Sequence, residues 1–125
     1  MIGLTLDAGA LIAIDRNERD ATLLVHGALK RGLPIAIPAG VVAQVWRDGG
    51  RQARLARVLN HEAVEIVVLD DLTARQAGML CGTQGTADVV DASVVLCAHQ
   101  RGHRIATSDP DDLLRLDRHV ELIVV

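Results

Sequence analysis

The chain has 125 residues, half of them hydrophobic and 23% charged, which suits one domain with a substantial apolar core and excludes a disordered chain. Its 13 basic and 16 acidic residues give a net charge of −3, which argues against a protein that binds nucleic acid mainly through bulk positive charge. No apolar run approaches the roughly 18 residues that cross a membrane, so we expect a single domain over residues 1–125 without a membrane partner.

Short apolar runs alternate with helical patterns along the chain, which predicts an α/β fold with a mainly parallel central sheet between two helical layers. About five strands are expected, at residues 2–6, 34–37, 63–69, 104–107 and 120–125. Helices are expected at residues 8–14, 19–31, 39–47, 51–60, 71–80 and 87–100, and from Ser108 or Asp109 to Leu116. Residues 82–85 are predicted as a loop, with Thr86 as the N-cap of the next helix.

The first residues, MIGLTLDAGALIA, contain no basic segment before the apolar run and meet Asp7 early. This pattern differs from a secretory signal, so we expect a cytoplasmic protein. Cys81 and Cys97 are too far apart for a CxxC pair, and we expect two buried, reduced thiols. The five histidines show no ligand spacing, which argues against a zinc site.

Two aspartates lie at the ends of predicted strands. Asp7 comes after the first strand, and Asp109 comes after the strand at residues 104–107. Ligands of open parallel sheets bind beyond the carboxyl ends of the strands, so both residues are candidate site residues. Each could instead serve only as the N-cap of the following helix, and for Asp109 the Asp-Pro start with Asp112 three residues on fits that simpler role.

A third aspartate is harder to explain as a cap. Asp91 lies more than a turn into the helix predicted at residues 87–100, on a face shared with Val94 and Val95, and Asp88 is one turn away. Two carboxylates about 4 Å apart repel by roughly 4 kcal/mol at an effective dielectric constant of about 20. A divalent cation would compensate this repulsion, although a partner arginine could also do so.

The three aspartates together predict a metal site at one end of the sheet. Carboxylate oxygens without histidine or cysteine partners favour Mg²⁺ or Mn²⁺. Such an ion suits phosphodiester hydrolysis, because it polarises the phosphoryl oxygen and activates a bound water molecule.

Three segments carry a resemblance to a known family: LTLDAGALIAI, IPAGVVAQVW and DVVDASVVLCAHQRGHRIATSD. In their order and spacing the sequence resembles PIN-domain ribonucleases, specifically the VapC-type toxins of bacterial toxin–antitoxin pairs. The resemblance implies a PIN-like three-layer fold, Mg²⁺- or Mn²⁺-dependent cleavage of RNA, inhibition by an antitoxin protein, and a homodimer. It implies that Asp7, Asp91 and Asp109 are the metal ligands and that Thr107 or Ser108 orients Asp109 or a bound water.

One position departs from the family pattern. Family members usually carry a glutamate where this chain has Gln44, and an amide cannot act as a base at neutral pH. Asp88 is the nearest acid that could restore the missing charge, so we include it among the catalytic candidates. A catalytically weak or inactive PIN-like module that binds RNA or a protein is the alternative function. A phosphotransfer domain fits less well, because DAG lacks the second aspartate of a DxD motif.

A run of arginines offers a possible RNA contact. Arg47, Arg51, Arg54 and Arg57 recur at intervals of three or four residues, and a guanidinium group suits phosphate. The stripe could hold RNA phosphates beside the acidic site, or it could simply be a solvated face. Trp46, the single aromatic residue, is expected to pack rather than to stack on bases.

Overall fold

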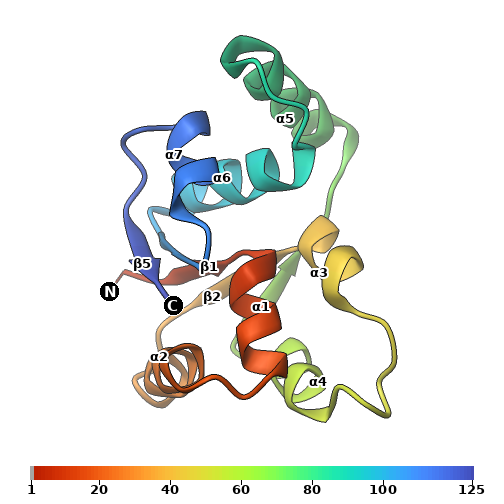
Figure 1. Ribbon diagram of the computed structural model, residues 1–125, viewed down its shortest axis with the longest axis vertical. Helices are drawn as coiled ribbons and strands as arrows, with labels where there is room; N and C mark the ends of the chain where they lie inside the picture. The colour runs from red at the N-terminus through yellow and green to blue at the C-terminus, as the bar shows by residue number, and fades with distance from the viewer. Residues whose placement is uncertain (1) are drawn as a thin grey trace.

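Residues 2–125 are described by the computed structural model, in which a parallel sheet lies between two helical layers (Figure 1). The strands are Leu4–Leu6 (β1), Ile35–Pro38 (β2), Val64–Val67 (β3), Arg104–Thr107 (β4) and Leu122–Val124 (β5). The helices are Ala8–Asp15 (α1), Arg19–Lys30 (α2), Ala39–Val45 (α3), Ala53–Leu59 (α4), Asp71–Gln84 (α5), Val89–Arg101 (α6) and Pro110–Leu116 (α7). The predicted α/β class and the three-layer arrangement are therefore confirmed.

The order of the strands determines where a site can form. The sheet has the order β3-β2-β1-β4-β5, and every pairing is parallel. The chain builds outward from β1 in one direction through β2 and β3, and in the other direction through β4 and β5. The order thus reverses between β1 and β4, and in sheets of this kind ligands bind at this point, beyond the carboxyl ends of the strands. Asp7 follows β1 directly, and Asp109 follows β4 after Ser108.

Helices cover both faces of the sheet. Figure 1 shows α5, α6 and α7 on one side and α1, α2 and α4 on the other. Because both faces are covered, β1 and β2 are buried along their whole length, which explains why Thr5 is the single polar residue in these two strands. The fully buried side chains include Leu6, Leu11, Ile37, Ile105 and Leu113. Both cysteines are buried free thiols, as expected.

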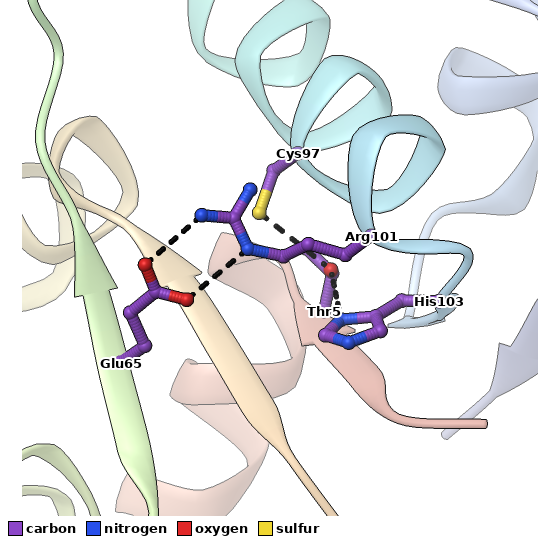
Figure 2. A network of polar contacts seen from close by, with 5 residues as sticks. All are labelled: Thr5, Glu65, Cys97, Arg101 and His103. Carbon is purple, nitrogen blue, oxygen red and sulfur yellow. Dashed lines mark hydrogen bonds and ion pairs between the residues drawn. The ribbon is translucent and has the colours of Figure 1, made fainter. Parts of the chain in front are cut away.

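A polar network fixes the C-terminal end of α6 to the sheet (Figure 2). The Arg101 guanidinium group donates to both carboxylate oxygens of Glu65 on β3, at 3.2 and 3.0 Å. The guanidinium group reaches Glu65 across β2, where Ala36 lies in register with Glu65 and with Thr5. The Thr5 hydroxyl group lies 3.1 Å from Nδ1 of His103. These contacts set the direction in which α6 crosses the sheet.

Two details of the predicted boundaries were wrong. Residues 82–84 continue α5 instead of forming a loop, because the exposed Gly82 costs only about 1 kcal/mol relative to alanine inside a helix. The helix ends at Gly85, whose φ of 69° suits glycine. Thr86 belongs to that ending, since its N–H group donates to the carbonyl oxygen of Cys81 at 3.1 Å. The N-cap of α6 is Asp88.

Smaller differences concern the ends of other elements. Strands β1, β3 and β5 are shorter than predicted, and α4 begins at Ala53 because residues 46–52 form an irregular connection. The buried amide of Gln52 organises this connection: its Oε1 accepts hydrogen bonds from the N–H groups of Arg47 and Asp48 at 2.7 and 2.9 Å. Trp46 packs against the core, as expected.

Candidate active site

Asp7 lies at the carboxyl end of β1, in the centre of the sheet. Its N–H group continues the ladder by donating to the carbonyl oxygen of Ala106 on β4 at 3.3 Å. Its Oδ1 accepts a hydrogen bond from the N–H group of Ala10 at 2.8 Å, which makes Asp7 the N-cap of α1. The residue is only 4% exposed. Burial raises the pKa of Asp7 even though hydrogen bonds from Thr107 and Ala10 oppose the rise.

The β4–α7 loop brings Asp109 to the same end of the sheet. A Cβ atom at Gly9 would collide with the side chain of Ser108, so glycine at this position lets the loop pack on the first turn of α1. The N–H group of Asp109 donates to Oγ1 of the buried Thr107 at 2.9 Å. Asp109 is the N-cap residue of α7, but its side chain makes no capping hydrogen bond within the described chain. Its carboxylate is exposed to solvent and also raises the pKa of Asp7.

Asp91 approaches the same end of the sheet from α6. It lies in the first turn, and its N–H group donates to Oδ1 of the N-cap residue Asp88 at 2.9 Å. The expectation that Asp91 lies more than a turn into the helix was therefore wrong, because Asp88 caps the helix and α6 begins only at Val89. Burial raises the pKa of Asp91 to about 7, and the negative charges of Asp88, Asp7 and Asp112 contribute to the rise.

The structure therefore brings the predicted acids into one electrostatic group. Asp7 interacts with both Asp109 and Asp91, while Asp88 interacts with Asp91. These residues come from the ends of β1 and β4 and from the start of α6. Aspartates that raise one another's pKa at the switch point of a parallel sheet can attract a cation or retain a proton.

Asp112 is a further member of the group, although its sequence position suggested only helix capping. It lies on α7 and raises the pKa of both Asp109 and Asp91. Together with Asp88 and Asp91 it lines a cavity of about 210 Å³. A signal for this role was present in the sequence, because Asp109 and Asp112 are three residues apart and so share a face of the short helix.

Gln44 lies on α3, on the same face as Gly40. Gly40, one turn earlier on the same face, would place a Cβ atom 3.5 Å from the side chain of Val90, the neighbour of Asp91. Gln44 itself is exposed. A glutamate at this position would therefore bring a carboxylate to the side of α3 that faces the start of α6.

The four arginines do not form one stripe. Residues 46–52 are not helical, so the regular interval between Arg47 and Arg57 does not place the side chains on one face. Arg51 pairs with Asp48, whereas Arg54 and Arg57 line a hollow of about 230 Å³ with Ile14 and His26. Ile14 lies near the C-terminal end of α1, whereas the acidic group lies at its N-terminal end. Their contact with RNA stays a prediction.

Comparison with family models gives one match, to the PIN domain, over residues 4–119. The chain belongs to the PIN domain family. The resemblance seen in the sequence is thereby confirmed at the level of the family. Most members of this family are nucleases, and they typically use divalent metal ions. No curated protein matches the sequence of this PIN domain.

Solved structures show the same PIN fold at low sequence identity. VapBC2 from Rickettsia felis, solved with a DNA fragment from its promoter, matches with a TM-score of 0.73 and 17% identity, over 100% of this chain and 99% of that chain. FitAcB from Neisseria gonorrhoeae matches with a TM-score of 0.62 and 16% identity, over 96% of each chain. PAE2754 from Pyrobaculum aerophilum matches with a TM-score of 0.65 and 17% identity, over 97% of this chain and 83% of that chain.

The acidic group of this PIN domain fits a hard cation by its chemistry but not yet by its arrangement. Its donors are carboxylate oxygens that repel one another, which is the donor set that Mg²⁺ and Mn²⁺ prefer. Within residues 2–125, however, no three acidic, histidine or cysteine side chains are close enough together to hold a metal ion as they stand. Binding an ion would therefore require the carboxylates of this group to move closer together.

No helix in the described residues 2–125 is both long and apolar enough to span a membrane.

Proposed function

We propose that this PIN domain is a metal-dependent endoribonuclease in which Asp7, Asp91 and Asp109 bind Mg²⁺ or Mn²⁺. The observation that carries the proposal is the electrostatic interaction of Asp7 with both other aspartates at the carboxyl ends of β1 and β4. Crowding these carboxylates together costs electrostatic free energy, and a bound dication would remove that repulsion. The family match supports a nuclease, and the structural neighbours support a toxin of the VapC type.

Each residue has a distinct part in this proposal. Asp7, buried and fixed by its bond to Ala10, is the most rigid ligand, and Thr107 holds the backbone of Asp109 beside it. A bound Mg²⁺ or Mn²⁺ would supply Lewis-acid activation of water and of the RNA phosphate. Because Gln44 cannot accept a proton, Asp88 and Asp112 are the carboxylates that remain beside Asp91 to accept one from the attacking water.

The toxin role adds two protein partners to the proposal. VapBC2 and FitAcB are structures of toxin–antitoxin type, which supports a cognate antitoxin for this chain as well. We also retain the homodimer, because Val68, Leu69, Leu72 and Met79 at and before α5 expose between 53% and 73% of their surface. A cellular RNA substrate would place the protein in the cytoplasm.

The proposal is tested by incubating purified protein with bacterial RNA and Mg²⁺ or Mn²⁺. We expect cleavage that stops when EDTA is added and that Asp7→Asn abolishes. Asp20→Asn, at an exposed position in the first turn of α2, is the matched control and should cleave normally. Cleavage that survives both chelation and Asp7→Asn would belong to a contaminant or to another site, and would refute the proposal.

A catalytically weak or inactive module is the second candidate. Gln44 in place of a glutamate favours it, as does the lack of a ready three-residue metal group within residues 2–125. Titration with Mn²⁺ separates the two functions. The active enzyme should bind Mn²⁺ at micromolar to millimolar concentrations, whereas the inactive module should bind none and yield no product at high protein concentration.

A further inference from the structure

We propose that Arg115, assisted by Arg118, binds the RNA phosphate next to the one that is cleaved. This inference rests on the proposed nuclease function and names a substrate-binding element for it. It starts from two adjoining hollows at α7, which lies beside α6 in the helical layer that carries Asp91 (Figure 1).

Arg115 belongs to both hollows. The first is the acidic cavity of about 210 Å³ that contains Asp88, Asp91 and Asp112, and Arg115 is the one cationic residue among the described residues that line it. The second, of about 460 Å³, lies between the end of α5 and the segment that follows α7. Leu116 also lines both hollows, so they meet at this turn of α7. A strand that enters the acidic cavity can therefore continue past Arg115 into the second hollow.

The second hollow is basic where the first is acidic. Arg118 and His119 line it together with Arg115, and Nε of Arg118 donates to Nε2 of His119 at 3.4 Å, which holds the guanidinium group there. Asp117 also lines this hollow, and its Oδ1 accepts a hydrogen bond from the N–H group of His119 at 2.9 Å. Two arginines against one aspartate leave a net positive charge beside a net negative cavity.

The guanidinium group of Arg115 forms no ion pair with a carboxylate of residues 2–125. Asp111 and Asp112 precede it by four and three residues, at the spacing that usually forms an ion pair along a helix. Among residues 2–125, however, no carboxylate oxygen lies within 4.0 Å of its guanidinium nitrogens, in contrast to Arg51, Arg75, Arg101 and Arg104. An exposed guanidinium group in this state can bind a phosphate with two parallel hydrogen bonds.

This arrangement suits a nuclease of net charge −3. The acidic cavity alone would repel RNA, and an adjacent cationic side chain would hold the strand in place without occupying the cleavage position. A simpler role for Arg115 would be to offset the charges of the nearby aspartates. That role would affect the binding of a cation but not the binding of RNA phosphates, so experiment can distinguish the two.

The test measures binding of a fluorescently labelled random-sequence RNA pool to the Asp7→Asn protein, in which cleavage is blocked, over a series of salt concentrations. Arg115→Ala should weaken binding by roughly three- to tenfold and lower the slope of log K against log salt by about 1. Arg115→Lys should keep the slope. Arg31→Ala, at the exposed C-cap of α2, is the matched control and should behave as the parent protein.

Mn²⁺ affinity of the otherwise wild-type Arg115→Ala protein is measured in parallel. An unchanged Mn²⁺ affinity with weakened RNA binding supports the phosphate contact. An altered Mn²⁺ affinity with unchanged RNA binding overturns the phosphate contact, because it shows that Arg115 only offsets the charges of the nearby aspartates. If the wild-type protein cleaves RNA but Arg115→Ala and Arg31→Ala bind alike, only this inference fails. If the wild-type protein neither binds nor cleaves RNA, the proposed function fails and this inference fails with it.

Discussion

The carboxylate of Asp7 raises the pKa of Asp91, although one residue follows the first strand and the other begins the sixth helix. The parallel sheet explains this relationship, because it directs the end of β1 toward the first turn of α6. Crowded carboxylates of this kind are unfavourable unless a proton or a cation is shared among them. Changes to their charge should therefore alter both metal binding and stability.

Asp7→Asn should separate the structural role of this residue from its functional role. Asparagine can accept the capping hydrogen bond from Ala10 as well as aspartate can, so α1 should remain intact. The variant also removes a buried charge, so the free energy of unfolding at pH 7.5 should stay equal or increase, while Mn²⁺ binding is lost. Chemical denaturation and calorimetric titration measure these two quantities. A strongly destabilised variant would mean that the negative charge of Asp7 stabilises the fold.

The stability of the metal-free protein should fall as the pH rises. The pKa of Asp91 is about 7 in the folded protein and about 3.8 in the unfolded chain, so the folded state holds the extra proton between these values. Stability is therefore highest near pH 4 for this group and decreases up to about pH 7, by at most a few kcal/mol. Urea denaturation should show this decrease as the difference between the wild-type protein and Asp91→Asn. Parallel pH profiles for the two proteins would contradict the assignment.

Gly9→Ala should displace the loop that carries Asp109. The new methyl group would collide with the side chain of Ser108, at a cost of about 1–3 kcal/mol, and RNA cleavage should fall with it. Combining Gly9→Ala with Ser108→Gly restores the space and should recover much of the activity. Cleavage rates and unfolding free energies of the two variants provide the measurement. If Gly9→Ala and the double variant lose the same cleavage rate and unfolding free energy, the contact between residue 9 and Ser108 does not position the loop.

Gln44→Glu tests whether the departure from the family pattern weakens the site. A carboxylate on this face of α3 would add a ligand or base near the start of α6, so we expect tighter Mn²⁺ binding and a higher cleavage rate. Gln44→Ala should change neither property much, because the amide is exposed. If Gln44→Glu has no effect while Gln44→Ala is inactive, the amide itself is part of the catalytic site.

The exposed apolar residues beside and on α5 should mediate the homodimer. Leu72 is 65% exposed, and replacing it by glutamate should convert a particle of twice the 13.4 kDa chain mass into a monomer. Leu23→Glu, at a residue on α2 that is 59% exposed, is the matched control and should remain dimeric. Light scattering after gel filtration measures the mass. A monomeric wild-type protein would refute the predicted dimer.

Much of the fold could be predicted from the sequence because its signals are local. Short, mostly apolar runs identify buried parallel strands, and an aspartate at the end of such a run indicates a residue at the carboxyl edge. The sequence alone was therefore sufficient to assign Asp7 and Asp109 to that edge. The length of α5 was not predictable in this way, since Gly82 resembles a helix breaker and only its exposed position explains why it is tolerated.

The rest of the site depends on tertiary contacts that leave weak traces in the sequence. An acid in the third position of a helix is ordinary, so the sequence suggested only a capping role for Asp112, and its place in the acidic group depends on the packing of α7 beside α6. The prediction that four arginines form one stripe was wrong for the opposite reason. Its interval is helical, but the buried amide of Gln52 stabilises an irregular connection in the middle of it.

The most direct test of the central claim is an anomalous difference map, recorded at the manganese absorption edge, from a crystal of the protein grown with Mn²⁺. A peak in contact with the carboxylates of Asp7, Asp91 and Asp109 is the predicted result. A map without a peak at this position, with the three side chains directed away from one another or neutralised by arginine, would contradict the assignment of this end of the sheet as a metal-dependent active site.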